Sequence, residues 1–146
     1  MVYYIHIYTT TYRMGFELDE QTYCMLSPRM VVFDLEFVGD LTQGVSNCYL
    51  WSIGAVHIAT RTTFSVIMDP QVRPFPPTHD KCVKVDEDYL NNHGAVSLRE
   101  GLEMFFDWLG CHNVVIAHNN FKADKLVLEQ ACRRAGVRCP LLYFMD

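Results

Sequence analysis

The order of strand-like and helix-like segments restricts the folds open to this chain more than any other feature of its sequence. Three short β-rich segments come first, and two units follow in which a long amphipathic helix precedes another short apolar segment. Short apolar runs bounded by turn residues are typical of buried strands. A meander of three strands followed by crossings through helices gives a mixed sheet with helices packed against it. We therefore predict an α/β domain with strands at 30–33, 49–57, 62–68, 114–117 and 141–145 and helices at 98–109 and 121–135.

The first predicted helix has clear signals at both ends. Ser97 and Glu100 form a capping-box pattern, in which the serine side chain accepts a hydrogen bond from a free amide of the first turn. Gly110 is a typical C-terminal stop. Four prolines between positions 69 and 77 predict an irregular loop before this helix. The apolar stripe of the helix consists of Leu102, Phe105, Phe106 and Leu109.

The composition suits one compact domain, and the net charge is weak evidence against a nucleic-acid partner. Half of the 146 residues are hydrophobic and 20% are charged, which favours a packed core over disorder. The formal net charge of −5 counts against a nucleic-acid binder, since such domains are usually basic. That argument weakens if divalent cations neutralise clustered acidic residues.

Cysteine usage and hydropathy predict an intracellular protein. The six cysteines include no CxxC pair, so they give no zinc signature, and we expect reduced thiols. No apolar run is long enough to span a membrane, and the first residues lack the pattern of a signal peptide.

Residues 1–29 have no clean hydrophobic period, although a strand is compatible with their alternation. We predict an N-terminal extension at 1–29 in front of a domain at 30–146. The extension is rich in tyrosine, and a protein partner could dock there by strand addition.

Two acidic residues interrupt the most hydrophobic predicted strand. Asp34 and Glu36 are two positions apart, so their side chains point to the same face of the strand. Two carboxylates brought together on a buried strand repel each other, and a divalent cation between them relieves that repulsion. Oxygen-only ligation suits Mg²⁺ or Mn²⁺. The alternative is that these acids lie at the exposed end of the strand, solvated or paired with a cationic side chain.

A second polar block, from 117 to 124, begins where another predicted strand ends and continues into a helix. Open α/β sheets bind ligands at such strand ends. Asp124 would lie in the first turn of that helix. The alternative is purely structural, with Asn119 capping the helix and Asp124 complementing its dipole.

Together the two blocks resemble the DEDD superfamily of 3′→5′ exonucleases, which have a ribonuclease H-like fold. Asp124 falls at the acidic position of the family's second motif, six residues after His118. That offset is similar to the one in the TREX-like branch of the DEDDh enzymes. The resemblance covers residues 30–146. Its matched segments are 31–36 (VVFDLE) for the first motif, 51–56 (WSIGAV) and 64–70 for the strands that follow, and 115–119 (VIAHN) for the second motif.

The sequence departs from the family pattern in two places. The first motif usually continues with threonine, where this chain has Phe37. The third motif places a histidine, or in one branch a tyrosine, shortly before a fourth aspartate, and no histidine follows His118. Tyr143 and Asp146 are one residue too close together, and come too early, to serve as the tyrosine-type motif. We therefore expect the C-terminal part of the fold to be missing.

The resemblance implies hydrolysis of a phosphodiester at the 3′ end of DNA or RNA with two Mg²⁺ or Mn²⁺ ions. Asp34 would bridge both ions. Glu36 would hold the ion on the side of the nucleophile, and Asp124 would act on the other ion, partly through water. These three residues are the predicted catalytic and metal-binding set.

The resemblance also places Phe37, His118 and Asn119 against the substrate, with His118 shaping the turn rather than acting as a base. The absent histidine would be the general base, and loss of such a group typically lowers a rate ~10²–10⁴-fold. We therefore expect this chain alone to be a poor catalyst.

Three interpretations remain open at this point. The chain is an incomplete piece of an active exonuclease, or it is a catalytically inactive ribonuclease H-like module used for binding or assembly. In the third interpretation the acidic motif on the strand is incidental to a globular domain.

Overall fold

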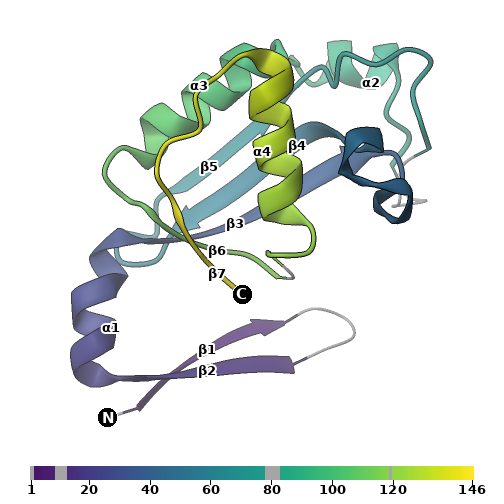
Figure 1. Cartoon of the computed structure of the whole chain (residues 1–146). Coiled ribbons are helices and arrows are strands. Elements are labelled where there is room, and N and C mark those ends of the chain that lie inside the picture. Colours follow the sequence, from purple (N-terminus) through teal and green to yellow (C-terminus); the bar gives the residue numbers. More distant parts are fainter. Residues whose placement is uncertain (1, 9–12, 78–82, 119) are drawn as a thin grey trace.

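A five-stranded mixed sheet forms the centre of the structure, which is a computed structural model (Figure 1). It describes residues 2–8, 13–77, 83–118 and 120–146, with the backbone alone for 2–8 and 13–19. The strand order is β5-β4-β3-β6-β7. Their bounds are β3 Met30–Val38, β4 Tyr49–His57, β5 Thr63–Ile67, β6 Val114–Ile116 and β7 Tyr143–Met145.

The pairing directions confirm the predicted α/β class with a mixed sheet. β4 runs antiparallel to both of its neighbours, β3 and β5, as a meander requires. β6 then lies parallel to β3, and β7 lies parallel to β6, because a helix precedes each of these two strands. The β3–β6 pairing covers only Met30 to Val32 on β3, so the second half of β3 extends past the end of β6.

Helices α3 (Leu98–Leu109) and α4 (Asp124–Ala135) contribute to the same core cluster on one face of the sheet. The apolar stripe predicted for α3 faces this cluster, because Leu102 and Phe105 are fully buried in it. On β3 the residues that face it are Val31, Phe33 and Leu35. In Figure 1, α4 crosses the strands, and the segment after it returns along the sheet to β7.

The opposite face of the sheet carries two smaller clusters, one toward each end of β3. One contains Val38, Trp51 and Leu90, and it brings in the short helix α2 (Glu87–Asn92). The other contains Met30 and Ile116 among its buried residues. Alternation along a strand therefore places Asp34 and Glu36 on this face, between the two clusters.

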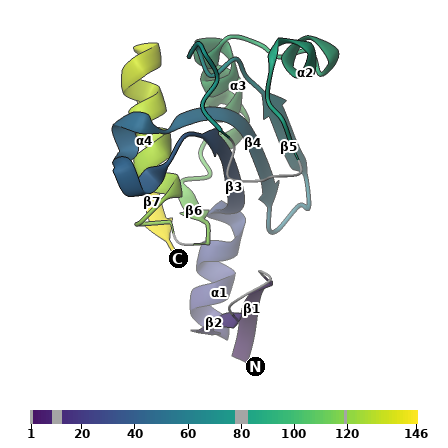
Figure 2. The ribbon, with the colours of Figure 1, turned by 90° about the vertical axis from the view of Figure 1, so that its right-hand side faces the viewer.

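The N-terminal residues form a unit of their own below the five-stranded sheet (Figures 1 and 2). Strands β1 (Val2–Tyr8) and β2 (Arg13–Asp19) pair with each other in an antiparallel two-stranded sheet. Helix α1 (Glu20–Leu26) and the 3₁₀ turn η1 (Ser27–Arg29) connect that sheet to β3.

Several element boundaries differ from the sequence prediction. β3 continues to Val38 because β4 pairs with it from Val31 to Val38. α4 begins at Asp124 rather than near residue 121, since the chain first makes a turn after β6. Helices α1 and α2 are too short to show an apolar period, and the prediction missed both. Within the described ranges, no helix has the length and apolar character that crossing a membrane requires.

Candidate functional site

Asp34 and Glu36 are exposed residues on the same face of β3, and the buried Leu35 lies between them in the chain. Their cross-strand partners on β4 are small: Asp34 is opposite Gly54, and Glu36 is opposite Ser52. Both partners leave room above the sheet because neither has a bulky side chain. The alternation therefore produces a pair of carboxylates on an open part of this face.

Asp124 reaches the same strand from α4. It is the first residue of the helix, only 6% of it is exposed, and its Oδ1 accepts a hydrogen bond from the backbone N–H of Leu35 (3.3 Å). That N–H lies beyond the point where β6 stops pairing with β3. A buried N–H needs an acceptor, and the Asp124 carboxylate supplies it. This contact fixes Asp124 next to the two acids of β3.

The three carboxylates interact electrostatically. Burial raises the pKa of Asp124 to about 7, and the negative charges of Asp34 and Glu36 add to that rise. The hydrogen bond from the Leu35 backbone acts in the opposite direction without cancelling it. Asp34 is exposed as a residue, but partial burial of its carboxyl group raises the pKa, and the nearby His118 side chain partly offsets this rise. Asp124 is therefore harder to ionise than an ordinary carboxyl group, partly because Asp34 and Glu36 are close to it.

The donor set of Asp34, Glu36 and Asp124 suits a divalent cation in its chemistry. Carboxylate oxygens are the ligands that Mg²⁺ and Mn²⁺ prefer. A cation would offset the burial that raises the pKa values of Asp34 and Asp124, and the repulsion from Asp34 and Glu36 that adds to the rise at Asp124. As arranged, however, the described residues contain no group of three or more His, Cys, Asp or Glu side chains that could enclose a metal ion. Glu36 lies beside the pair rather than completing such a cage.

The residues predicted to contact substrate lie in different surroundings. His118 is half-buried in the turn after β6, close enough to Asp34 to affect its pKa. Phe37 is half-buried and packs against the main core. Asn119 lies outside the described residues. Ala123 is the N-cap residue of α4, and its side chain accepts no hydrogen bond. The helix therefore begins at Asp124 without a side-chain cap.

Asn120 is a residue of this site to which the sequence prediction gave no role. It is fully buried, and its side-chain amide donates to the carbonyls of Met145 (2.9 Å) and Val115 (3.4 Å). Its Oδ1 has no partner among the described residues. Next to it, the Phe121 N–H donates to Oδ1 of Asp146 (3.2 Å). A pair of asparagines shortly after the predicted strand 114–117 was the signal in the sequence for this role in shaping the turn.

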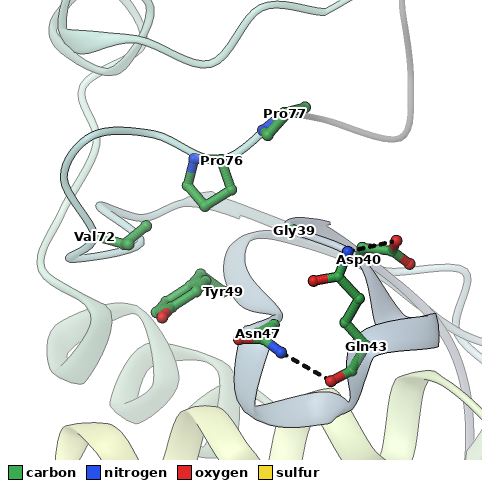
Figure 3. Close-up of a pocket in the computed structure, with 8 residues that line it drawn as sticks. All are labelled: Gly39, Asp40, Gln43, Asn47, Tyr49, Val72, Pro76 and Pro77. Atoms are coloured by element: carbon green, nitrogen blue, oxygen red, sulfur yellow. Dashed lines mark hydrogen bonds between the residues drawn. The ribbon is translucent and has the colours of Figure 1, made fainter.

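A separate cavity of about 480 Å³ lies past the end of β3 (Figure 3). Figure 3 shows Val72, Pro76 and Pro77 from the proline-rich loop opposite the polar residues that follow β3, with the Tyr49 ring between them. The polar side comes from two 3₁₀ turns, η2 (Leu41–Gln43) and η3 (Val45–Asn47).

Hydrogen bonds fix the polar wall of this cavity. Asp40 accepts from Thr42 and Gln43, and Asn47 donates to the Gln43 carbonyl at 2.8 Å. The N–H of Gly39 donates to Pro77 O (3.1 Å), which joins the two loops. None of the predicted site residues lines the cavity, so it is distinct from the acidic site.

No protein-family model matches the chain, and no curated protein matches it in sequence.

Proposed function

We propose that the chain carries the acidic half-site of a metal-dependent 3′→5′ exonuclease with a ribonuclease H-like fold. Asp34, Glu36 and Asp124 form this half-site and hold Mg²⁺ or Mn²⁺ against the 3′ end of a nucleic acid. The resemblance of the two sequence motifs to the DEDD superfamily supports the reaction class. The five-stranded mixed sheet is compatible with it.

One observation carries the proposal. Asp124, from a helix, is brought to the strand that carries Asp34 and Glu36, and burial together with these two charges raises its pKa to about 7. Burial alone would select an apolar or amide side chain at this position, because an isolated buried charge is unfavourable. Strongly raised carboxylate pKa values in one place are typical of functional sites. A bound cation would favour the ionised carboxylates and so lower these pKa values.

Each residue has a defined part in the proposed site. Asp34 and Asp124 bind the cation, and Glu36 adds a carboxylate beside them. The Leu35 N–H orients Asp124 through its hydrogen bond. Asn120 fixes the turn between β6 and α4 through the hydrogen bonds of its side-chain amide to β6 and β7. When bound, the metal ions would align a water molecule for attack on the terminal phosphodiester and stabilise the leaving oxygen.

A second function, a catalytically inactive ribonuclease H-like module for binding or assembly, is the alternative. The absence of an enclosing group of three ligands in the described part of the chain favours this alternative.

The test combines metal binding with hydrolysis. The chain, and any longer product that continues past Asp146, is incubated with 5′-labelled single-stranded DNA or RNA and Mn²⁺. Calorimetry on the same samples measures Mn²⁺ binding. Asp34→Asn and Asp124→Asn are the site variants, and Asp107→Asn, at an exposed position of α3, is the matched control.

Shortening from the 3′ end that both site variants abolish and Asp107→Asn preserves is the expected result. Mn²⁺ binding that depends on Asp34 and Asp124 without hydrolysis, in the chain and in the longer product, assigns the inactive module instead. Equal Mn²⁺ binding by wild type and both site variants contradicts both functions and leaves the acidic motif incidental.

A further inference from the structure

Two cysteines meet where α4 ends. Cys132 lies in the last turn of the helix and is 3% exposed, whereas Cys139 is half-buried in the segment that leads to β7. Between them Gly136 adopts a left-handed conformation (φ +64°), and the N–H of Val137 donates to Cys132 O at 3.0 Å. The chain therefore reverses over the end of the helix, as in a Schellman motif.

This reversal brings the two thiols into a hydrogen bond with each other. Both cysteines also pack against the main core cluster, Cys132 inside it and Cys139 at its margin. The contact is therefore held by the core and not by the loop alone. A sulfur pair in contact across a fixed chain reversal is the arrangement from which a disulfide can form with little backbone movement.

We propose that Cys132 and Cys139 are a redox-sensitive thiol pair, which an oxidant of the disulfide or peroxide class converts into an intramolecular disulfide. The pair is a modification site separate from the acidic site on β3, and it does not depend on the function proposed for that site.

The surroundings assign different roles to the two thiols. The hydrogen bond from the Cys132 thiol lowers the pKa of Cys139, against the effects of burial and of Glu129. The same hydrogen bond, followed by burial, raises the pKa of Cys132, while Arg133 acts in the opposite direction. Since the thiolate is the reactive form, Cys139 attacks first and Cys132 resolves. Cys139 is also the more exposed of the two, so an oxidant reaches it first.

With glutathione disulfide as oxidant the steps balance as follows. The Cys139 thiolate attacks one sulfur of the oxidant, whose S–S bond breaks, and a glutathione thiolate leaves. Cys132 then loses its proton to solvent and attacks the Cys139 sulfur, which forms the intramolecular bond and releases the second glutathione thiolate. The cysteine pair gives up two electrons, and the oxidant takes them up.

The cross-link would tether the end of α4 to the segment entering β7. β7 is connected to the acidic site, because the Asn120 amide donates to the carbonyl of Met145 and the Phe121 N–H donates to Asp146. Closing this short loop should raise the melting temperature by roughly 5 °C in the oxidised protein. The other described cysteines lie in separate segments: Cys24 on α1, Cys48 before β4 and Cys111 after α3.

The test is a disulfide map of the wild-type chain after equilibration in buffers of increasing ratio of glutathione disulfide to glutathione. Samples are quenched by alkylation in denaturant, and intact mass and tryptic peptides are measured. Trypsin cleaves after Lys125, Arg133 and Arg138, so the proposed bond links peptide 126–133 to peptide 139–146. Cys139→Ser is the test variant, and Cys111→Ser, at an exposed cysteine, is its matched control.

The expected result is a wild-type chain that loses two alkylatable cysteines, contains the linked peptide and melts at the higher temperature. Cys111→Ser should behave in the same way, and Cys139→Ser should show none of these changes. Three results would each overturn the proposal: both thiols staying alkylatable at every ratio, linked peptides from any other pair, or oxidation that stops at a glutathione adduct on Cys139. The wild-type map decides the question even if a variant fails to fold.

Discussion

Replacing Asp124 by asparagine should change how the stability of the protein depends on pH. The pKa of this carboxyl is about 7 in the folded protein, against 3.8 as the ordinary value, and burial is the main cause. The folded protein therefore binds more protons than the unfolded chain between these two values. Its stability is highest at low pH and falls as the pH rises through that window.

The magnitude follows from the two pKa values. Each pH unit between them changes the free energy of unfolding by about 1.4 kcal/mol, so the whole window amounts to about 4 kcal/mol. About 2.5 kcal/mol of this lies between pH 5 and pH 8. In the Asp124→Asn protein, the new side-chain oxygen would still accept the hydrogen bond from the Leu35 N–H, and the amide would not ionise.

The assay is urea unfolding followed by circular dichroism at several pH values from 5 to 8, without divalent cations. The Asp124→Asn protein should lose about 2.5 kcal/mol less than wild type over this range, and it should be the more stable protein at pH 8. Asp107→Asn, at an exposed position of α3, should follow wild type. Parallel curves for wild type and Asp124→Asn would refute the reasoning, because Asp124 would then have the same pKa in both states.

Three further predictions concern the scaffold around the site, each measured by urea unfolding. Gly39→Ala should destabilise the protein by more than about 2 kcal/mol, because φ of Gly39 is +102° and the new Cβ would lie 1.8 Å from Asn47 O. Gly54→Ala is the control and should change the free energy of unfolding by less than about 1 kcal/mol, since no atom lies within 4 Å of its Cβ position. Equal effects of the two substitutions would contradict the argument. Ser97→Ala removes the cap that accepts from the Glu100 N–H and should cost about 1 kcal/mol, whereas an unchanged midpoint would mean that water replaces it. Phe105→Ala empties a fully buried position and should cost about 3–5 kcal/mol, and a loss below about 1 kcal/mol would show that the core collapses around the gap.

Local patterns in the sequence were sufficient for part of the fold and of the candidate site. The serine cap, apolar stripe and glycine stop of α3 are short-range signals, and the helix begins and ends where they predict. β4 likewise has the predicted bounds. The period of two along β3 was enough to place Asp34 and Glu36 on one face, because that geometry belongs to the strand itself.

Other features depend on contacts between distant segments, and sequence patterns do not contain them. Asp124 meets β3 because β6 stops short of Leu35 and leaves its N–H in need of an acceptor. The thiol contact between Cys132 and Cys139 likewise depends on how the chain reverses after α4. The sequence by itself thus determined the main strands and helices of the five-stranded domain, the faces of β3 and the candidate chemistry. Only the tertiary structure decided which buried groups became neighbours and how far burial moved their pKa values.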